Sequence, residues 1–178
     1  MNPGHIYYAV ADDRAFLKLV GSIRYPLSQR LSLAVGRLFE KPHPRGVVVD
    51  LQEAEFIDST CLGLLARVAT QSLNATHEWP VILSREPEVN QLLCSMGFDR
   101  MFTLVQDPAS PTAGLTDAEG LAGLARRPDP KLVLEAHRAL SEINESNQHL
   151  FQNVIEQLES AILEESSRTP SQMRANPF

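Results

Sequence analysis

The sequence predicts an α/β fold, a mixed sheet of about five strands with helices packed on it. Two observations carry this prediction. Residues 5–10 (HIYYAV) and 14–20 (RAFLKLV) are short, rich in strand-forming residues and separated by an acidic turn, which indicates a hairpin. From residue 46 to 105, short apolar runs alternate with stretches whose apolar residues recur at helical spacing, the pattern of right-handed βαβ crossovers. An antiparallel hairpin joined to parallel crossovers makes the sheet mixed.

Proline, glycine and β-branched residues place the remaining elements. Gly21 closes the second strand, and Pro26 suits the first turn of a helix that Pro42 and Pro44 end. The unbroken run Val47–Val49 is typical of a strand covered on both faces. We therefore expect, in chain order, a helix over 26–41, a strand over 46–51, a loop over 52–58, a helix over 60–73, a strand over 81–83, a helix over 86–96 and a strand over 101–105.

Beyond this domain, assigned to residues 1–105, the composition changes. Residues 106–130 are rich in Pro, Ser, Thr, Ala and Gly, as linkers are, with a short helix as an option over 117–126. Residues 131–166 contain no Gly or Pro and keep a near-heptad apolar spacing, which predicts one helix about 50 Å long. The tail over 167–178 is predicted to be disordered.

A helix of that length exceeds what one small domain can cover, so two arrangements are open. It can bury its apolar stripe against a second copy of itself or another protein, and Asn147, at an otherwise apolar position, would then set the register. Alternatively, the helix folds back on the domain and Asn147 lies at the edge of the contact. The first arrangement predicts self-association through this helix.

Overall composition excludes several classes of function. The 178 residues are 43% apolar and 21% charged, which is globular. A net charge of −6 argues against nucleic acid as the main partner, because phosphate binding requires a basic face. The start lacks a signal-peptide pattern, and no apolar run approaches the roughly 20 residues of a membrane helix. We therefore expect a cytoplasmic protein without a membrane segment.

Polar residues at the start of the second helix form the candidate site. Asp58, Ser59 and Thr60 are residue types whose side-chain oxygens accept hydrogen bonds from the free amides of a first helical turn. Capping alone would explain them. In addition, the Ser59 hydroxyl would lie at a helix N-terminus, where the backbone dipoles favour added negative charge.

The wider string resembles the signature of STAS domains, the bacterial anti-sigma factor antagonist family. That signature is an apolar strand, Asp or Asn, a short loop, then F-hydrophobic-D-S-S/T-G-L-G, and the resemblance covers roughly residues 5–105. The matching residues are Val47 to Asp50, Phe56, Ile57, Asp58, Ser59, Thr60, Leu62 and Gly63.

This resemblance implies a switch that depends on phosphorylation of Ser59. An anti-sigma factor of the histidine-kinase-like ATPase type would phosphorylate Ser59, and the unphosphorylated protein would bind that factor and free a sigma factor. A PP2C-type serine phosphatase, which can be fused to a response-regulator receiver, would reverse the modification. The partner-binding positions carried over are Asp58, Ser59, Thr60, Leu62 and Gly63.

Two positions depart from the family pattern. Cys61 stands where glycine is usual, and a small buried helical residue is the expected role rather than a redox one. Arg24 ends the string Gly21-Ser22-Ile23-Arg24, where the family often has an acidic residue. We hypothesise that Arg24 lies close enough to Ser59 to pair with an attached phosphate or with an acidic group on the partner.

A second class of function is a STAS interaction module without phosphorylation, as a subunit of a transporter or signalling complex. An enzyme has the least support. The chain has no G-x-x-x-x-G-K-S/T and no G-x-S-x-G, and its five histidines lack metal-ligand spacing. No cofactor or metal is expected, and the histidines are expected at the surface or at helix caps.

Overall fold

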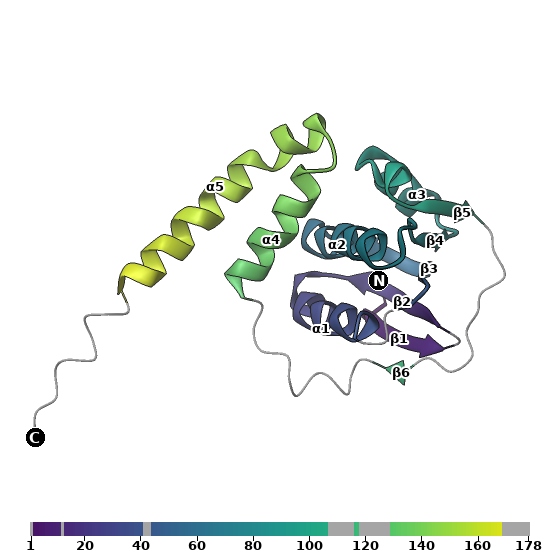
Figure 1. Cartoon of the computed structure of the whole chain (residues 1–178). Helices are drawn as coiled ribbons and strands as arrows, with labels where there is room; N and C mark the ends of the chain where they lie inside the picture. Colours follow the sequence, from purple (N-terminus) through teal and green to yellow (C-terminus); the bar gives the residue numbers. More distant parts are fainter. Residues whose placement is uncertain (1, 12, 41–43, 107–115, 118–128, 169–178) are drawn as a thin grey trace, which may run out of the picture.

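The computed structural model describes residues 2–11, 13–40, 44–106, 116–117 and 129–168. A sheet with helices packed on it forms the first part of the chain, and two further helices lie beside it (Figure 1). The predicted α/β class is therefore confirmed.

The sheet has six strands in the order β5-β4-β3-β2-β1-β6. The predicted hairpin is confirmed, since β1 pairs antiparallel with β2, while β2, β3, β4 and β5 pair in parallel. The sixth strand is only two residues long and pairs with β1. The strands are β1 (His5–Ala11), β2 (Arg14–Ile23), β3 (Gly46–Ile57), β4 (Val81–Ser84), β5 (Thr103–Gln106) and β6 (Thr116–Asp117).

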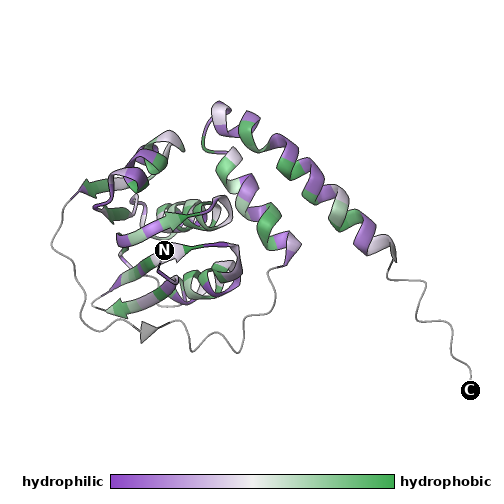
Figure 2. Cartoon of the chain, turned by 180° about the vertical axis from the view of Figure 1, so that it is seen from behind, coloured by the Kyte–Doolittle hydropathy of each residue, from purple (hydrophilic) through white to green (hydrophobic). Residues whose placement is uncertain are grey.

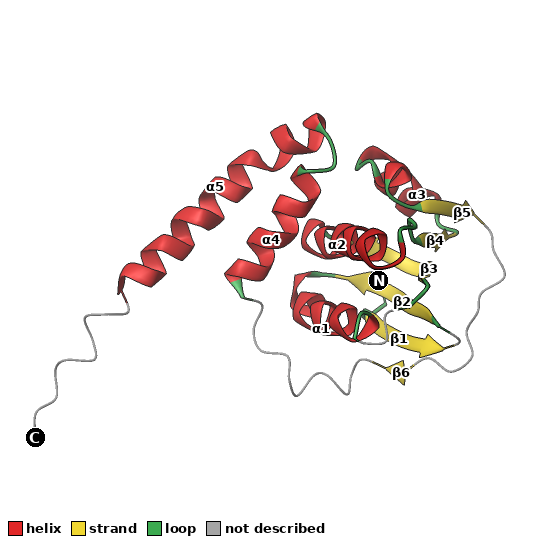
Figure 3. Cartoon of the chain, viewed as in Figure 1, coloured by secondary structure: helices red, strands yellow, loops and turns green. Residues whose placement is uncertain are grey.

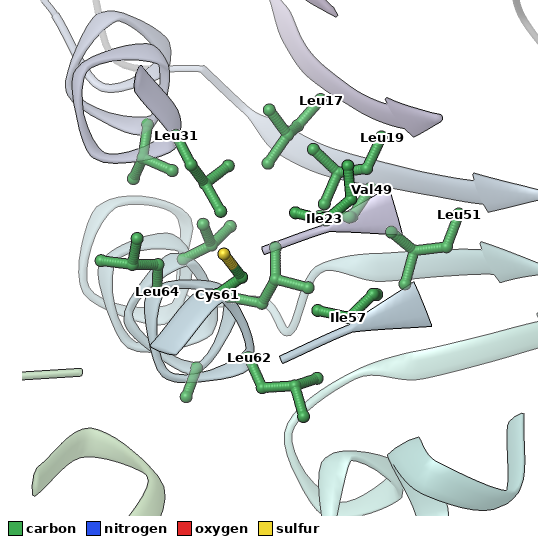
Figure 4. Packing of buried hydrophobic residues seen from close by; sticks show 14 of the residues in the cluster. Leu17, Leu19, Ile23, Leu31, Val49, Leu51, Ile57, Cys61, Leu62 and Leu64 are labelled. Carbon is green, nitrogen blue, oxygen red and sulfur yellow. The ribbon is translucent and has the colours of Figure 1, made fainter. Parts of the chain in front are cut away.

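Three helices and two 3-10 turns complete this domain (Figure 3). Leucines from the central strands point toward Leu31 of the first helix and toward Cys61 and Leu64 of the second, which closes one hydrophobic core (Figure 4). Alternate strand residues face this core because side chains of a strand alternate between the two faces of the sheet. The elements are η1 (Tyr25–Leu27), α1 (Ser28–Leu38), α2 (Ser59–Thr76), α3 (Pro87–Ser95) and η2 (Phe98–Arg100).

The third strand is longer than the sequence predicts. The loop expected over 52–58 is instead the second half of β3, which continues to Ile57 beside β2. Likewise, Gly21 does not end β2: it lies at a register shift within the strand, with φ of +72°. Only a residue without a Cβ fits there, because a Cβ would lie 2.4 Å from the carbonyl oxygen of Pro3.

The predicted single helix over 131–166 is wrong in one respect: the chain forms two helices. These are α4 (Pro130–Ser141) and the long α5 (Glu145–Arg168). We call the pair the C-terminal arm. Within it, α4 packs on both α2 and α5, whereas α5 extends away from the sheet (Figure 1).

Asn147 explains the turn between the two helices. Its side-chain amide donates to the carbonyl oxygens of Met96, at 2.9 Å, and Leu140, at 3.0 Å, and Asn147 is only 2% exposed. The side-chain oxygen of Asn144 accepts a hydrogen bond from the backbone amide of Asn147 at 2.8 Å and so caps α5. Asn147 therefore joins the arm to the end of α3. Its predicted role in setting a coiled-coil register is wrong. The alternative prediction, that Asn147 lies at the edge of the contact between a folded-back helix and the domain, is also wrong.

Two other expectations fall largely outside the described residues. The optional helix over 117–126 is one: Asp117 belongs to β6, and residues 118–128 are not described. The disordered tail predicted over 167–178 is the other, since α5 includes 167–168 and residues 169–178 are not described.

Candidate functional site

Asp58 caps α2, as its residue type predicts. One carboxylate oxygen accepts from the Cys61 amide at 2.9 Å, and the other accepts from the backbone amide of Tyr25. The Asp58 amide in turn donates to the carbonyl oxygen of Ile23 at 3.1 Å. Asp58 therefore fastens the end of β2 to the start of α2, and so determines where the first residue of that helix lies.

Ser59 is that first residue, and it has a partner that the sequence did not suggest. Its hydroxyl oxygen lies 3.0 Å from Nε2 of His137 on α4. The other ring nitrogen, Nδ1, lies 2.8 Å from the carbonyl oxygen of Val133. A carbonyl only accepts hydrogen bonds, so Nδ1 carries a proton, and in that tautomer Nε2 accepts from the Ser59 hydroxyl. Ser59 is partly exposed, whereas His137 is 5% exposed.

Gly63 allows α4 to approach α2 closely. A Cβ at this position would lie 2.1 Å from the carbonyl oxygen of Ala136, closer than nonbonded atoms can stand. One turn further along, Arg67 donates to Glu135 at 3.0 Å. Ser59, Gly63 and Arg67 follow one another at intervals of four residues, so they share one face of α2. α4 lies beside α2 (Figure 1) and contacts it at these residues.

The other predicted residues of α2 face the interior. Thr60, Cys61 and Leu62 are all buried, and Figure 4 shows Cys61 and Leu62 among the core side chains. Burial, and then the nearby Asp58, raise the pKa of the Cys61 thiol well above its usual range. Cys61 thus fits the expected role of a small buried residue. Cys94, in contrast, is exposed.

Arg24 stacks on Phe56 beside the start of α2. Its guanidinium carbon lies 4.3 Å from the centroid of the ring, a cation–π geometry. Arg24, Tyr25 and Phe56 are all exposed, and Tyr25 is held to Asp58 through its amide. The structure thus brings these residues to the Ser59 end of α2. The pairing of Arg24 with a phosphate on Ser59 stays a prediction.

His137 and its neighbours on α4 are the site residues that the sequence prediction missed. The expectation that every histidine lies at the surface or at a helix cap is wrong for His137, which is 5% exposed inside α4. A signal was available, because Val133, His137 and Leu140 recur at helical spacing, and this places a histidine on an apolar stripe. That spacing shows burial but does not name the partner. The contact with Ser59 joins residues far apart in the chain, so local pattern cannot reveal it.

Among the described residues, no group of three or more metal-ligating side chains lies together. No helix in the part of the chain that the structure describes is long and apolar enough to cross a bilayer.

Comparisons with known proteins agree with this architecture. The STAS domain family matches residues 7–110. An anti-sigma factor antagonist from Mycobacterium paratuberculosis has a similar structure, with a TM-score of 0.51 and 21% identity over 70% of this chain and 95% of that one. This likeness supports the fold. No curated protein matches the sequence.

Two further structures have lower TM-scores. A putative anti-sigma factor antagonist from Thermotoga maritima has a TM-score of 0.49 and 20% identity, over 57% of this chain and 85% of that one. The phosphorylated form of the Bacillus cell fate determinant SpoIIAA has a TM-score of 0.46 and 12% identity, over 58% and 92%.

Proposed function

This chain belongs to the STAS domain family, and from that membership we propose that it is a non-enzymatic anti-sigma factor antagonist switched by phosphorylation of Ser59. The observation that carries the proposal is the position of Ser59: it is the first residue of α2, partly exposed, directly after the capping Asp58. The names of the structurally similar proteins support the same role.

The physical basis of the switch is the charge that phosphorylation adds. A phosphoserine carries about 1.5 to 2 negative charges at neutral pH. The amides of the first turn of α2 tolerate this charge, but a partner packed over the same spot must desolvate it or repel it. A typical coupling of about 1–3 kcal/mol changes affinity by roughly 5- to 150-fold, which is enough for a switch.

The proposed partner is an anti-sigma factor of the histidine-kinase-like ATPase type, with a PP2C-type phosphatase reversing the modification. The contact surface would centre on Asp58, Ser59 and Arg24. Tyr25 and Phe56 extend it, since exposed aromatic side chains are common anchors of interfaces. Thr60 and Leu62 are buried, so we assign them to shaping the start of α2 rather than to direct contact. Gly63 is covered by α4, so a partner reaches it only where α4 has left this face.

The test is incubation of the protein with ATP and candidate anti-sigma factor kinases, followed by mass spectrometry. We expect one phosphate, on Ser59, that is lost in Ser59→Ala and kept in Thr60→Ala, because the Thr60 side chain is buried. Absence of phosphate on Ser59 with every kinase tried would contradict the proposal.

A constitutive interaction module, for example a subunit of a transporter or signalling complex, is the second candidate. The observation that favours it is the arm, because α5 exposes Leu150, Val154 and Leu163, and Figure 2 shows hydrophobic and hydrophilic residues mixed along it. Partner binding would then be equal in wild type and Ser59→Ala, and would fall in Leu150→Glu.

Self-association through the C-terminal helix stays a prediction, now assigned to α5. Leu150 and Val154 are four residues apart and exposed on one face. Analytical ultracentrifugation should show a dimer in wild type and a monomer in the Leu150→Glu, Val154→Glu double variant. A wild-type monomer at every concentration would contradict it.

A further inference from the structure

We propose that α4 is an internal competitor for the Ser59 face of α2, so that phosphorylation and partner binding both require the C-terminal arm to leave it. The inference deepens the proposed function and rests on it for the identity of the kinase and partner. The occupant itself is present in the structure: α4 is the segment that lies on this face (Figure 1).

Three contacts along α2 define the covered face. The Ser59 hydroxyl donates to His137, the backbone of Ala136 lies over Gly63, and Arg67 pairs with Glu135. Ala136 is fully buried. A partner that used the same face would have to displace all three contacts.

The docked α4 obstructs phosphorylation of Ser59, because it places the His137 ring 3.0 Å from the serine oxygen. Phosphoryl transfer forms a bond between the serine oxygen and the γ-phosphorus of ATP and breaks the bond from that phosphorus to the β–γ bridging oxygen. ADP leaves, and the hydroxyl proton passes to a base of the kinase. The kinase must reach the serine oxygen in line with the breaking bond, whereas His137 lies 3.0 Å from that oxygen.

The product also fits poorly under the docked arm. Once phosphorylated, Ser59 has no hydroxyl proton to donate to Nε2, and the phosphoryl group needs the space that the buried His137 ring occupies 3.0 Å from the serine oxygen. Phosphate on Ser59 should therefore favour the undocked arm, and by linkage, removing the arm should favour phosphorylation.

The docked arm is nevertheless the ground state. Leu140 and Phe151 belong to the main hydrophobic core, and Asn147 bonds to the Met96 carbonyl at the end of α3. Docking is also intramolecular, so the effective concentration of α4 at this face is higher than the concentration of a free partner. Release therefore has to be driven, either by a partner with higher affinity or by the charge on Ser59.

The first experiment needs no kinase. Hydrogen–deuterium exchange of the α4 amides is compared in wild type, Ser59→Ala and Ser59→Asp, with Gln91→Glu as a control that adds one negative charge at an exposed position of α3. We expect exchange in α4 to be at least tenfold faster in Ser59→Asp, less affected in Ser59→Ala and unchanged in Gln91→Glu. Unchanged or slower exchange in Ser59→Asp overturns the proposal, because His137 would then be holding the charge.

The second experiment uses the kinase and full-length variants. Glu135→Arg places like charges at the Arg67 contact, and Ala136→Glu inserts a larger side chain at a fully buried position. We expect phosphorylation of Ser59 to be at least threefold faster in Glu135→Arg and tenfold faster in Ala136→Glu, with tighter binding of the anti-sigma factor. The charge-swapped pair Arg67→Glu, Glu135→Arg should return to the wild-type rate.

The two failures are distinguishable. If Ser59 is phosphorylated at one common rate in wild type, Glu135→Arg and Ala136→Glu, the proposed function stands and the competition by α4 is wrong. If no variant is phosphorylated, including those with a released arm, the proposed function fails, and the exchange experiment still decides whether charge at Ser59 and docking of α4 are coupled.

Discussion

The STAS domain and the C-terminal arm are held in place by different kinds of interaction. Strands β2 and β3 and helices α1 and α2 share a core of fully buried leucines (Figure 4). The arm adds Ala136, Leu140 and Phe151 to that core, and it is also held by a serine–histidine hydrogen bond, an ion pair and a buried asparagine. Apolar burial is strong and non-directional, whereas polar contacts are weaker and specific. We therefore expect the arm, which depends more on polar contacts, to be released before the domain unfolds.

The largest expected difference between the two regions is in core truncation. Leu65, in α2, is 0% exposed, whereas Leu163, in α5, is 68% exposed. Leu65→Ala should lower the free energy of unfolding by about 2–5 kcal/mol, and Leu163→Ala should change it by less than about 0.5 kcal/mol. Chemical denaturation measures both. Similar values for the two variants would remove the distinction between core and arm.

The next largest effect is expected at the joint of the arm. Asn147→Ala leaves the carbonyl oxygens of Met96 and Leu140 without their donor, which should cost about 1–3 kcal/mol. Hydrogen exchange should locate the loss in the turn before α5 and not in the sheet. Asn153→Ala, an exposed position on α5, is the matched control and should have little effect. Increased exchange throughout β2 and β3 would show that the arm and the domain unfold together.

Gly63→Ala should weaken the docking of α4 and at the same time keep or slightly raise the stability of the domain. The added Cβ collides with the Ala136 backbone, so α4 should lose protection from exchange. Replacing glycine within a helix also favours α2 by up to about 1 kcal/mol. We expect the unfolding midpoint of the domain to be kept or slightly raised while α4 is released. A lowered midpoint with α4 still protected would mean that α2 moves instead of α4.

The smallest expected effect is a pH dependence of the free energy of unfolding that comes from the Cys61 thiol. Burial raises the pKa of the Cys61 thiol, so the folded state holds the neutral form that the unfolded state loses above a pKa near 9.0. Stability from this group is therefore complete below that pH and declines as the pH rises further.

At pH 8, a thiol reagent should modify the exposed Cys94 rapidly and Cys61 only on unfolding. In Cys61→Ala the alkaline decline should be smaller. Rapid modification of two thiols in the native protein would contradict the buried position of Cys61.

Some of the fold and the site followed from local pattern. The hairpin, the strand at Val47–Val49 and the cap at Asp58 depend on neighbours in the chain, and all three are predicted and confirmed, although Val48 is only partly buried. The second half of β3 was not predicted, because Glu53 and Glu55 have low strand propensity. They are in a strand because β2 is long enough to continue the pairing: Glu53 pairs with Val20, and Glu55 lies at the register shift between Gly21 and Ser22, with both glutamates exposed.

An α/β domain and a serine at a capped helix N-terminus can be predicted from local pattern, because helix caps, apolar periodicity and β-branched runs act within a few residues. The turn of the C-terminal segment at residues 142–144, and the contact of His137 with Ser59, depend on contacts between distant parts of the chain. No glycine or proline marks that turn. It exists because Asn147 bonds to the distant Met96 carbonyl and Gly63 leaves room for the backbone of α4, and such long-range contacts have no local signature.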